Sequence, residues 1–218
     1  MKETDDIAKK MLDLMEEDRH MSEKQKRIVQ AAIELFAEKG FAGTSTSEIA
    51  KKAGVAEGTI FRHYKTKKDL LMALTMPTLI SGVIPFFAAN FSEEVLDHDY
   101  PDFRTLVKNI IENRYEFTEK NGKLIKIYFL ELFYHDELRE QFSEIFMTHV
   151  KGKFDRLINY YKERGELADM PNSTIMRALI TNIVGFLLTR FVVMPDATWD
   201  DKAEVDYTVD YILHGLVK

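Results

Sequence analysis

The sequence predicts an all-α protein in which a small N-terminal domain of three helices precedes a larger helical domain. Apolar residues recur at helical spacing along almost the whole chain, and the alternation typical of β-strands is nearly absent. The 10 glycines and 5 prolines punctuate these apolar stripes, as they do where helices end. Two capping-box patterns near the N-terminus are typical of helix starts.

The first strong helix is predicted to begin after Ser22, because Ser-Glu-Lys-Gln at residues 22–25 is a capping box, and to end at Gly40. Its apolar stripe follows helical spacing and consists of Ile28, Ala32, Leu35 and Phe36. Residues 1–21 form an N-terminal extension. Its weak amphipathic helix, which either docks or frays, carries Ile7, Met11, Leu14 and Met15.

Two short helices separated by a tight turn follow. A second capping box, Ser-Thr-Ser-Glu at 45–48, begins a helix that reaches Lys52, and Gly54 suits a left-handed turn. The next helix is expected from about Ala56 to Tyr64, and Thr66 is expected to cap another. This is the pattern of a helix-turn-helix, whose second helix enters the major groove of DNA. The apolar seam between its helices consists of Ile49, Ala50, Ala53, Val55 and Ile60.

The rest of the chain is expected to continue as helices, with Gly122 and Gly165 at helix ends. The predicted ranges are roughly 101–119, 123–133, 136–164, 173–194 and 200–217. The 23 uncharged residues from Leu70 to Ser92 are long enough to span a bilayer. Pro77, Gly82 and Pro85 interrupt the run, so the preferred interpretation is a kinked helix or helix pair in a soluble domain. No membrane is therefore expected among the partners of the protein.

Composition and charge exclude several classes of function. The chain has no cysteine, which excludes disulfides, thiolate metal sites and cysteine nucleophiles. Catalytic and phosphate-binding motifs and metal-ligand spacings are absent from the sequence, so no enzyme, cofactor or metal is expected. The net charge is −6, but residues 22–70 carry +4. A basic segment in an acidic chain suits a local contact with DNA phosphates. The N-terminus lacks a signal-peptide pattern, so a cytoplasmic protein is expected.

The stretch AAIELFAEKGFAGTSTSEIAKKAGVAEGTIFRHYKTKKDLL, residues 31–71, resembles the N-terminal DNA-binding domain of the tetracycline-repressor (TetR) family. The resemblance covers about a fifth of the chain. The remainder is similar to the family only in being helical and of suitable length. The resemblance implies a transcriptional regulator that binds double-stranded operator DNA as a homodimer and carries a ligand-binding C-terminal domain.

Contacts with DNA are predicted for both helices of the motif. Thr46 and Ser47 offer hydroxyls and free amides to phosphate at the start of the first helix. Side chains of the second helix that suit base edges belong to Glu57, Gly58, Thr59 and Arg62. A carboxylate is repelled by phosphates, so the alternative for Glu57 is a capping role.

Three further DNA-contact positions come from the resemblance. His63 and Lys67 match positions that hold phosphate in the family. Phe61 stands where the family usually has a tyrosine whose hydroxyl reaches phosphate, so that contact is expected to be missing. Ala56 likewise replaces the usual serine-type cap, which predicts a less firmly started recognition helix.

The last two predicted helices suit dimerisation. Residues 178–189 are uncharged all round, which exceeds what one buried face requires. The final helix carries an apolar stripe of Val205, Val209, Ile212, Leu213 and Leu216. Two such helices from each chain would form a four-helix interface, and the alternative is packing within the monomer.

Large apolar residues suit a pocket for an apolar or amphipathic effector, although they suit an ordinary core equally well. Of 15 phenylalanines, 12 follow Leu71. By analogy with the family, the predicted pocket residues are Phe86, Phe87, Tyr115, Tyr128, Phe129, Phe133 and Phe146. Glu112 and Glu131 lie on largely apolar helices and are candidates for meeting a cationic ligand.

The sequence therefore predicts a homodimeric, ligand-responsive regulator, most simply a repressor. Its expected parts are the extension 1–21, the helix-turn-helix domain 22–70 and the effector-binding and dimerisation domain 71–218. The alternative is a DNA-binding structural or interaction protein without a small-molecule ligand.

Overall fold

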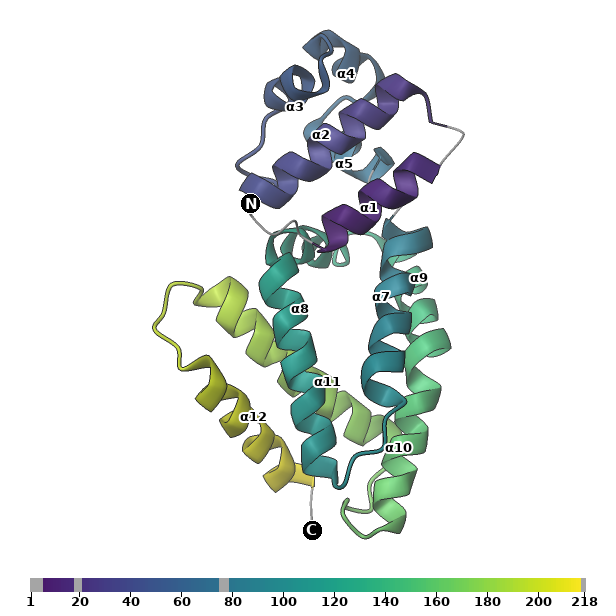
Figure 1. The fold of residues 1–218 in the computed structure, drawn as a ribbon, viewed down its shortest axis with the longest axis vertical. Helices are drawn as coiled ribbons and strands as arrows, with labels where there is room; N and C mark the ends of the chain where they lie inside the picture. Colours follow the sequence, from purple (N-terminus) through teal and green to yellow (C-terminus); the bar gives the residue numbers. More distant parts are fainter. Residues whose placement is uncertain (1–5, 18–20, 75–78, 217–218) are drawn as a thin grey trace. The chain divides into compact units, whose positions relative to one another are not determined.

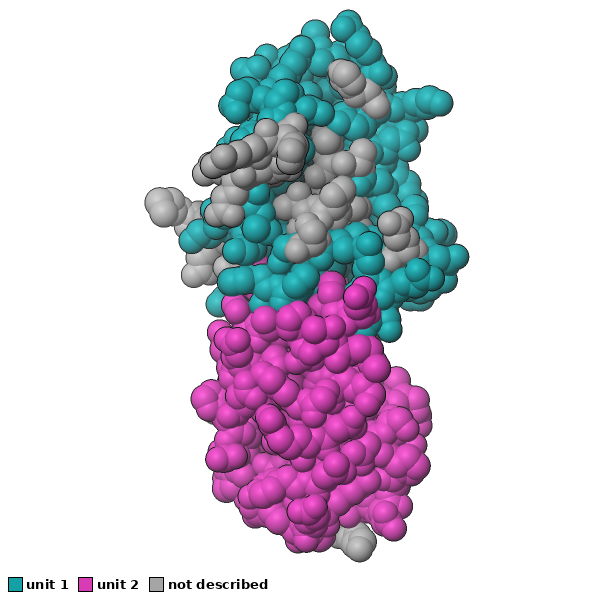
Figure 2. Space-filling model, turned by 90° about the vertical axis from the view of Figure 1, so that its right-hand side faces the viewer, with its two compact units in different colours: residues 1–86, 120–143 teal, residues 87–119, 144–218 magenta. Residues whose placement is uncertain are grey.

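The computed structural model describes residues 6–17, 21–74 and 79–216, and all regular structure in these ranges is helical, as predicted (Figure 1). The chain divides into two compact units (Figure 2). Unit 1 comprises residues 1–86 and 120–143, and unit 2 comprises residues 87–119 and 144–218. The predicted boundary between residues 70 and 71 is a functional division that these units do not test, and it stays a prediction.

The N-terminal extension contains a helix that docks in unit 1. Helix α1 (Asp6–Glu17) packs against α2 (Glu23–Lys39), and its Ile7 and Met11 are buried. The Ile7 amide also donates a hydrogen bond to Oδ1 of Asn121 at 2.9 Å. Of the two predicted outcomes, docking and fraying, the structure therefore shows docking; the side chain of Met15 lies outside the described part of the chain.

Helix α2 begins and ends where the sequence predicts. The Ser22 hydroxyl accepts a hydrogen bond from the Gln25 amide at 3.3 Å, and Gln25 Oε1 accepts one from the Ser22 amide at 3.1 Å. Gly40, at φ 73°, ends the helix, and its amide donates to the Phe36 carbonyl. The buried face of α2 is formed by Ile28, Val29, Ala31, Ala32, Ile33, Leu35 and Phe36.

The helix-turn-helix is confirmed in α3 (Thr46–Ala53) and α4 (Glu57–His63). Gly54 makes the turn with φ 65° and ψ 39°, a left-handed conformation that glycine adopts without strain. Ala56 provides no side-chain cap for α4. Helix α5 (Lys67–Leu74) follows and is capped by reciprocal 3.0 Å hydrogen bonds between Thr66 and Asp69. The seam of the motif buries Ile49, Ala50, Ala53 and Ile60.

Beyond α5, the described part of the uncharged run belongs to a helix that extends past Ser92 and has π-helical turns at both ends. It consists of η1 (Leu79–Val83), α7 (Ile84–Phe91) and η2 (Ser92–Leu96). Pro85 lacks an amide hydrogen, and the π-helical turn before it accommodates the interrupted hydrogen-bond ladder. A Cβ at Gly82 would collide with the Leu14 side chain, so this glycine permits the close approach of α1.

Helix α8 (Phe103–Glu131) corrects one prediction, because it runs through Gly122 without a break. A glycine inside a helix costs about 1 kcal/mol relative to alanine. Around Gly122, however, Asn121 and Leu124 are buried, and Asn121 holds the α1 amide. Burial of these neighbours outweighs the local preference of glycine for a helix end.

The remaining helices agree closely with the predicted ranges. Helix α9 (Asp136–Phe146), η3 (Met147–Lys151) and α10 (Gly152–Glu163) form one continuous run. Helix α11 (Asn172–Leu188) continues into η4 (Thr189–Val193), and α12 (Asp201–Leu216) follows. Helix α11 packs against both α10 and α12 (Figure 1). The core of unit 2 includes Phe103, Ile110, Phe154, Tyr161, Ile175 and Val209.

The outer faces of α11 and α12 leave large side chains uncovered. Residues 172–193 are long and apolar enough to cross a membrane, but the composition of a soluble core or interface helix is the same. Val209 and Ile212 of the predicted dimerisation stripe are buried in their own unit, which corrects the prediction that they form the dimer surface; Leu216 lies outside the described side chains. The exposed positions are instead Ile180, Val184, Tyr207 and Tyr211.

Candidate nucleic-acid interface

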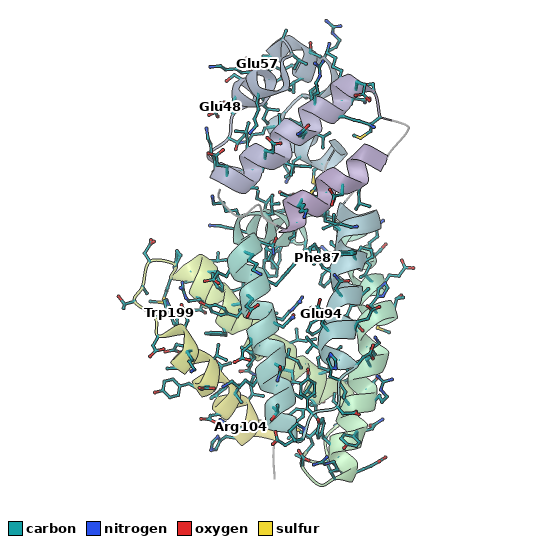
Figure 3. All side chains as sticks on the ribbon, viewed as in Figure 1. Glu48, Glu57, Phe87, Glu94, Arg104 and Trp199 are labelled. Carbon is teal, nitrogen blue, oxygen red and sulfur yellow. The ribbon has the colours of Figure 1, made fainter. Side chains whose placement is uncertain are left out.

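The candidate DNA-contacting surface is the outward side of α3 and α4. The seam between these helices is buried, and their other described side chains are partly or fully exposed. Figure 3 shows Glu48 and Glu57 in this part of unit 1. Thr46 and Thr59 are partly buried, and the exposed predicted residues are Ser47, Glu57, Gly58, Phe61 and Arg62. Five of the predicted contacts are therefore open to solvent, and their contact with DNA stays a prediction. His63 ends α4, but its side chain lies outside the described part of the chain.

Arg62 and Gly58 are available to a partner. Within the described ranges, Arg62 is exposed and has no hydrogen-bond or ion-pair partner. Its guanidinium is therefore free to donate two hydrogen bonds to a guanine. At Gly58, no atom lies within 4 Å of an added Cβ, so packing within the protein does not require glycine there.

Thr46 and Glu57, both predicted contacts, bind each other in the free protein. The Thr46 hydroxyl donates a hydrogen bond to Glu57 Oε1 at 2.9 Å and links the first turns of α3 and α4. This supports the alternative that Glu57 is structural, because its carboxylate is already hydrogen-bonded within the motif. Contact with a base through the same oxygen requires this bond to be shared or broken.

Glu48 anchors the start of α3 and was predicted as a capping residue. It accepts hydrogen bonds from the Ser45 amide and hydroxyl, each at 2.9 Å, and from Lys39 Nζ at 2.7 Å. The Lys39 hydrogen bond, followed by those from Ser45, lowers the pKa of Glu48 to about 2. The sequence pattern identified the cap but not Lys39, which lies nine residues earlier at the end of α2.

Lys67 is directed inward rather than toward solvent alone. Its ammonium donates hydrogen bonds to the carbonyls of Phe41 at 2.5 Å and Thr44 at 2.7 Å, and it lies 4.2 Å from the Phe41 ring centroid. Desolvation by burial lowers the pKa of Lys67. The side chain therefore braces the loop between α2 and α3, a role the sequence did not reveal, while its phosphate contact stays a prediction.

Phe61 places a large apolar ring on the exposed side of α4, with 47% of its surface accessible. No hydroxyl is present to reach a phosphate, as the sequence already indicated. The ring can instead contact thymine methyl groups or sugar carbons by apolar packing.

The predicted effector residues are divided between the units. In unit 1, Phe86 is exposed beneath the Lys10 ammonium, 4.2 Å from the ring centroid. Tyr128 is buried, and its hydroxyl lies 3.7 Å from Met11 Sδ, so α1 covers it. The rings of Phe129 and Phe133 are 5.5 Å apart, and Phe133 is 67% exposed.

In unit 2, the rings of Phe87 and Phe117 are 5.0 Å apart. Tyr115 packs against Phe186 and Phe191, and burial raises the pKa of Tyr115 to about 12. Phe146 packs against the core. Glu112 is exposed and lies 3.9 Å from Lys108. The structure thus places Phe87 in an aromatic cluster but leaves Glu112 on the surface.

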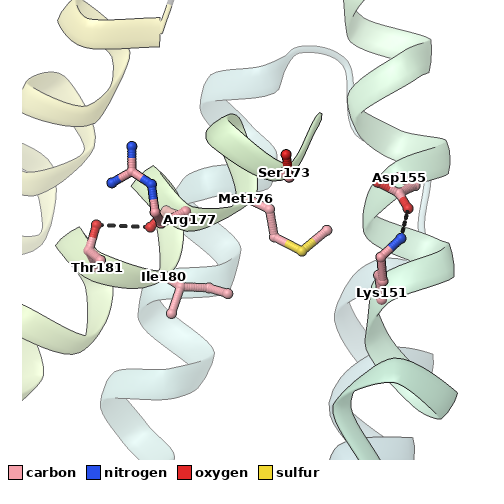
Figure 4. A pocket seen from close by; sticks show the side chains of 7 residues that line it. All are labelled: Lys151, Asp155, Ser173, Met176, Arg177, Ile180 and Thr181. Carbon is pink, nitrogen blue, oxygen red and sulfur yellow. Dashed lines mark hydrogen bonds and ion pairs between the residues drawn. The ribbon is translucent and has the colours of Figure 1, made fainter. Parts of the chain in front are cut away.

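An open pocket of about 280 Å³ lies beside α10 and α11 in unit 2 (Figure 4). Its charged wall is the ion pair between Lys151 and Asp155, with an N···O distance of 2.6 Å. The full lining is Lys151, Asp155, Ser173, Met176, Arg177, Ile180 and Thr181. None of the predicted effector residues is among them, and ligand pockets are typically larger, about 300–1,000 Å³.

Comparison with known proteins agrees with this geometry. Residues 28–74, from α2 through α5, match the model for bacterial regulatory proteins of the tetR family. The uncharacterized HTH-type transcriptional regulator YvdT of Bacillus subtilis is 29% identical over 79% of this chain and 84% of its own. The chain belongs to the TetR family. It is a DNA-binding transcriptional regulator, and this family is not one of enzymes.

Two further relatives cover both parts of this TetR-family regulator. The fatty acid metabolism regulator protein of Bacillus subtilis is 26% identical over 88% of this chain and 98% of its own. A solved structure of FadR from Bacillus subtilis in complex with stearoyl-CoA superposes with a TM-score of 0.58 at 24% identity, covering 87% of this chain and 97% of that one. At this identity the structural likeness establishes the fold alone.

Proposed function

We propose that this TetR-family regulator is a homodimeric repressor that leaves its operator when an apolar or amphipathic effector binds the helical domain. The observation that carries the proposal is an exposed recognition helix, α4, in a chain similar along 88% of its length to a fatty acid metabolism regulator. We propose the cytoplasm as its site of action, which the DNA target supports.

The proposed homodimer is supported by the uncovered surface of α11 and α12. Ile180, Val184, Tyr207 and Tyr211 are exposed in the isolated chain, and exposed apolar area of this kind marks interaction sites. One helix-turn-helix meets one half-site, so a dimer is needed to span two.

Coupling between the effector and DNA is proposed to pass through α5. The Lys67 ammonium at its first turn holds the loop that leads into α3 through the carbonyls of Phe41 and Thr44. A displacement of α5 therefore also displaces α3 and α4. Effector binding would change the spacing of the two recognition helices and so lower the affinity for the operator.

The test begins with selection of duplex DNA from a random-sequence pool by the full chain. The expected result is a palindromic site with two half-sites, bound with at least tenfold loss of affinity in Arg62→Ala. Palmitoyl-CoA and palmitate are then titrated into the complex, and DNA release is followed by fluorescence anisotropy. Release by either one supports the proposal. Selective DNA binding that no amphiphile changes would favour a structural or interaction protein without a small ligand.

A further inference from the structure

Arg114 is a charged residue on the core-facing side of α8. The stripe Val107, Ile110, Arg114 and Phe117 follows helical spacing, and Val107 and Ile110 are buried in unit 2. A guanidinium therefore occupies a position where the same helix face otherwise carries apolar side chains. Buried charges are costly unless they are paired or bound to a ligand.

The flat guanidinium is surrounded by aromatic rings. Its carbon lies 4.3 Å from the ring centroid of Phe91 and 4.8 Å from that of Phe117, and the Phe117 ring in turn contacts Phe87. Rings at this distance attract the cation and exclude water from its faces. They also place apolar side chains directly beside the charge.

The hydrogen bonds of Arg114 leave one edge of the guanidinium open. Nε and Nη2 both donate to the neutral Asn113 Oδ1, at 3.0 and 2.5 Å. Within the described part of the chain, Nη1 has no hydrogen-bond partner, and no carboxylate lies within ion-pair distance. The edge formed by Nη1 and Nη2 matches two oxygens of a carboxylate or phosphate.

The burial of Arg114 and the charges around it agree with a binding site that lacks its anionic partner. Desolvation lowers the pKa of Arg114 to about 10, and Glu94 acts in the opposite direction from outside ion-pair distance. Figure 3 shows Phe87 and Glu94 on the helical segment that faces α8. Arg114 stays charged at neutral pH, so a partly desolvated cation is kept without an ionic partner.

We propose that Arg114 binds the anionic oxygens of the effector, while the effector's apolar tail packs against Phe87, Phe91 and Phe117. The proposal rests on the proposed function, because it names the chemical class of the effector that would release the repressor from DNA. That class is an anionic amphiphile with a carboxylate or phosphate. It replaces the expectation of a cationic ligand. Glu112 is exposed near Lys108, and Glu131 pairs with Lys68 at 3.1 Å.

The test compares three probes with the same acyl chain: dodecanoate, dodecanol and dodecanoyl-CoA. Affinities for the full chain are measured by isothermal titration calorimetry. The wild type is expected to bind at least one anionic probe tenfold or more tighter than dodecanol. Arg114→Met should lose tenfold or more for that probe and less than twofold for dodecanol. Dependence on Arg114 for dodecanoate assigns a carboxylate, and dependence for dodecanoyl-CoA alone assigns a phosphate.

Two variants separate binding from folding. Without ligand, Arg114→Met should keep the wild-type Tm or exceed it, because it removes an unpaired, partly desolvated charge. Arg104→Met, on the same helix but in a surface ion pair with Asp210, is the matched control and should bind every probe as the wild type does. Arg114→Lys keeps the positive charge but cannot donate two parallel hydrogen bonds. It is expected to retain part of the preference for anionic probes over dodecanol. This variant can be measured in place of Arg114→Met if Arg114→Met does not fold.

Each contrary outcome points to a different failure. Unchanged affinity of Arg114→Met for the anionic probes overturns the role of Arg114 while the proposed function stands. A wild type that binds dodecanol as tightly as the anionic probes overturns the anionic class. A wild type that binds none of the three overturns the amphiphilic effector itself, and Arg114 with it.

Discussion

At the scale of single residues, Gly58 separates the requirements of folding from those of DNA binding. An added Cβ at Gly58 meets no atom within 4 Å, and alanine favours a helix by up to about 1 kcal/mol over glycine. We expect Gly58→Ala to keep or raise the Tm but to weaken binding to the selected DNA site at least tenfold, because the methyl group would occupy the DNA side of α4. Differential scanning fluorimetry and fluorescence anisotropy measure the two effects.

Gly122→Ala is the matched control for this substitution. It also adds a Cβ that meets no atom within 4 Å, but in α8 rather than in α4. It should raise the Tm and leave DNA affinity unchanged. Wild-type DNA affinity in Gly58→Ala would show that this side of α4 does not approach the duplex closely.

Glu48 gives unit 1 a pH dependence whose sign can be worked out. Its pKa is lowered from 4.5 to about 2 in the folded state, chiefly by Lys39 and then by Ser45. A lowered folded-state pKa means that the stabilisation is complete above about pH 4.5 and is lost as the pH falls toward 2. Glu48→Gln keeps acceptors for Ser45 but has no charge.

The measurement is the free energy of unfolding by urea between pH 2 and pH 6, for the wild type and Glu48→Gln. The wild type should be more stable at pH 6, and the difference should shrink steadily below pH 4.5. A difference that stays constant over this range would show that the charge of Glu48 contributes nothing to the cap.

At the scale of elements, α1 is expected to be a stabilising part of unit 1. Met11 is fully buried, with its sulfur 3.7 Å from the Tyr128 hydroxyl. Met11→Ala should lower the free energy of unfolding by about 2 kcal/mol or more, as large-to-small core substitutions do. Asp13→Ala, at an exposed position of the same helix, should change it by less than about 0.5 kcal/mol. Equal stabilities of the two variants in urea titrations would mean that α1 is undocked in solution.

The helices also show which structural features the sequence predicts and which it does not. Capping boxes at Ser22 and Ser45 and the left-handed Gly54 are local signals, and the structure has each of them where the sequence places it. The continuation of α8 through Gly122 depends on burial of residues distant in sequence, such as Ile7 against Asn121. Helix propensity describes only the local part of the folding free energy. Tertiary contacts therefore decide whether a helix ends or continues at a residue such as Gly122.

The same limit applies to the candidate sites. The outward residues of α3 and α4 follow from the motif, because its geometry fixes which positions are free. The inward direction of Lys67 and the aromatic surroundings of Arg114 arise from loops and helices that meet only in the fold. One signal for Arg114 was present, a charge at a core-facing helical position, but an isolated stripe does not reveal whether a partner carboxylate lies opposite.

At the scale of the whole molecule, the uncovered surface of α11 and α12 predicts how the regulator assembles. Ile180 is 38% exposed and Tyr211 is 72% exposed, although both are large side chains beside a well-packed core. We expect the wild type to sediment as a dimer and the double variant Ile180→Glu and Tyr211→Glu to sediment as a folded monomer. Because the substituted positions are exposed, charge there should prevent association without disturbing the core.

The DNA affinity of the monomer tests whether this surface serves recognition. The double variant should bind a single half-site as the wild type does, but its affinity for the full palindrome should fall by a factor of a hundred or more, because two linked half-sites raise the effective concentration of the second contact. Phe142→Glu, at a 47% exposed aromatic position on α9, is the control and should leave both the sedimentation and the DNA affinity unchanged. A double variant that still sediments as a dimer would place the interface elsewhere on the chain.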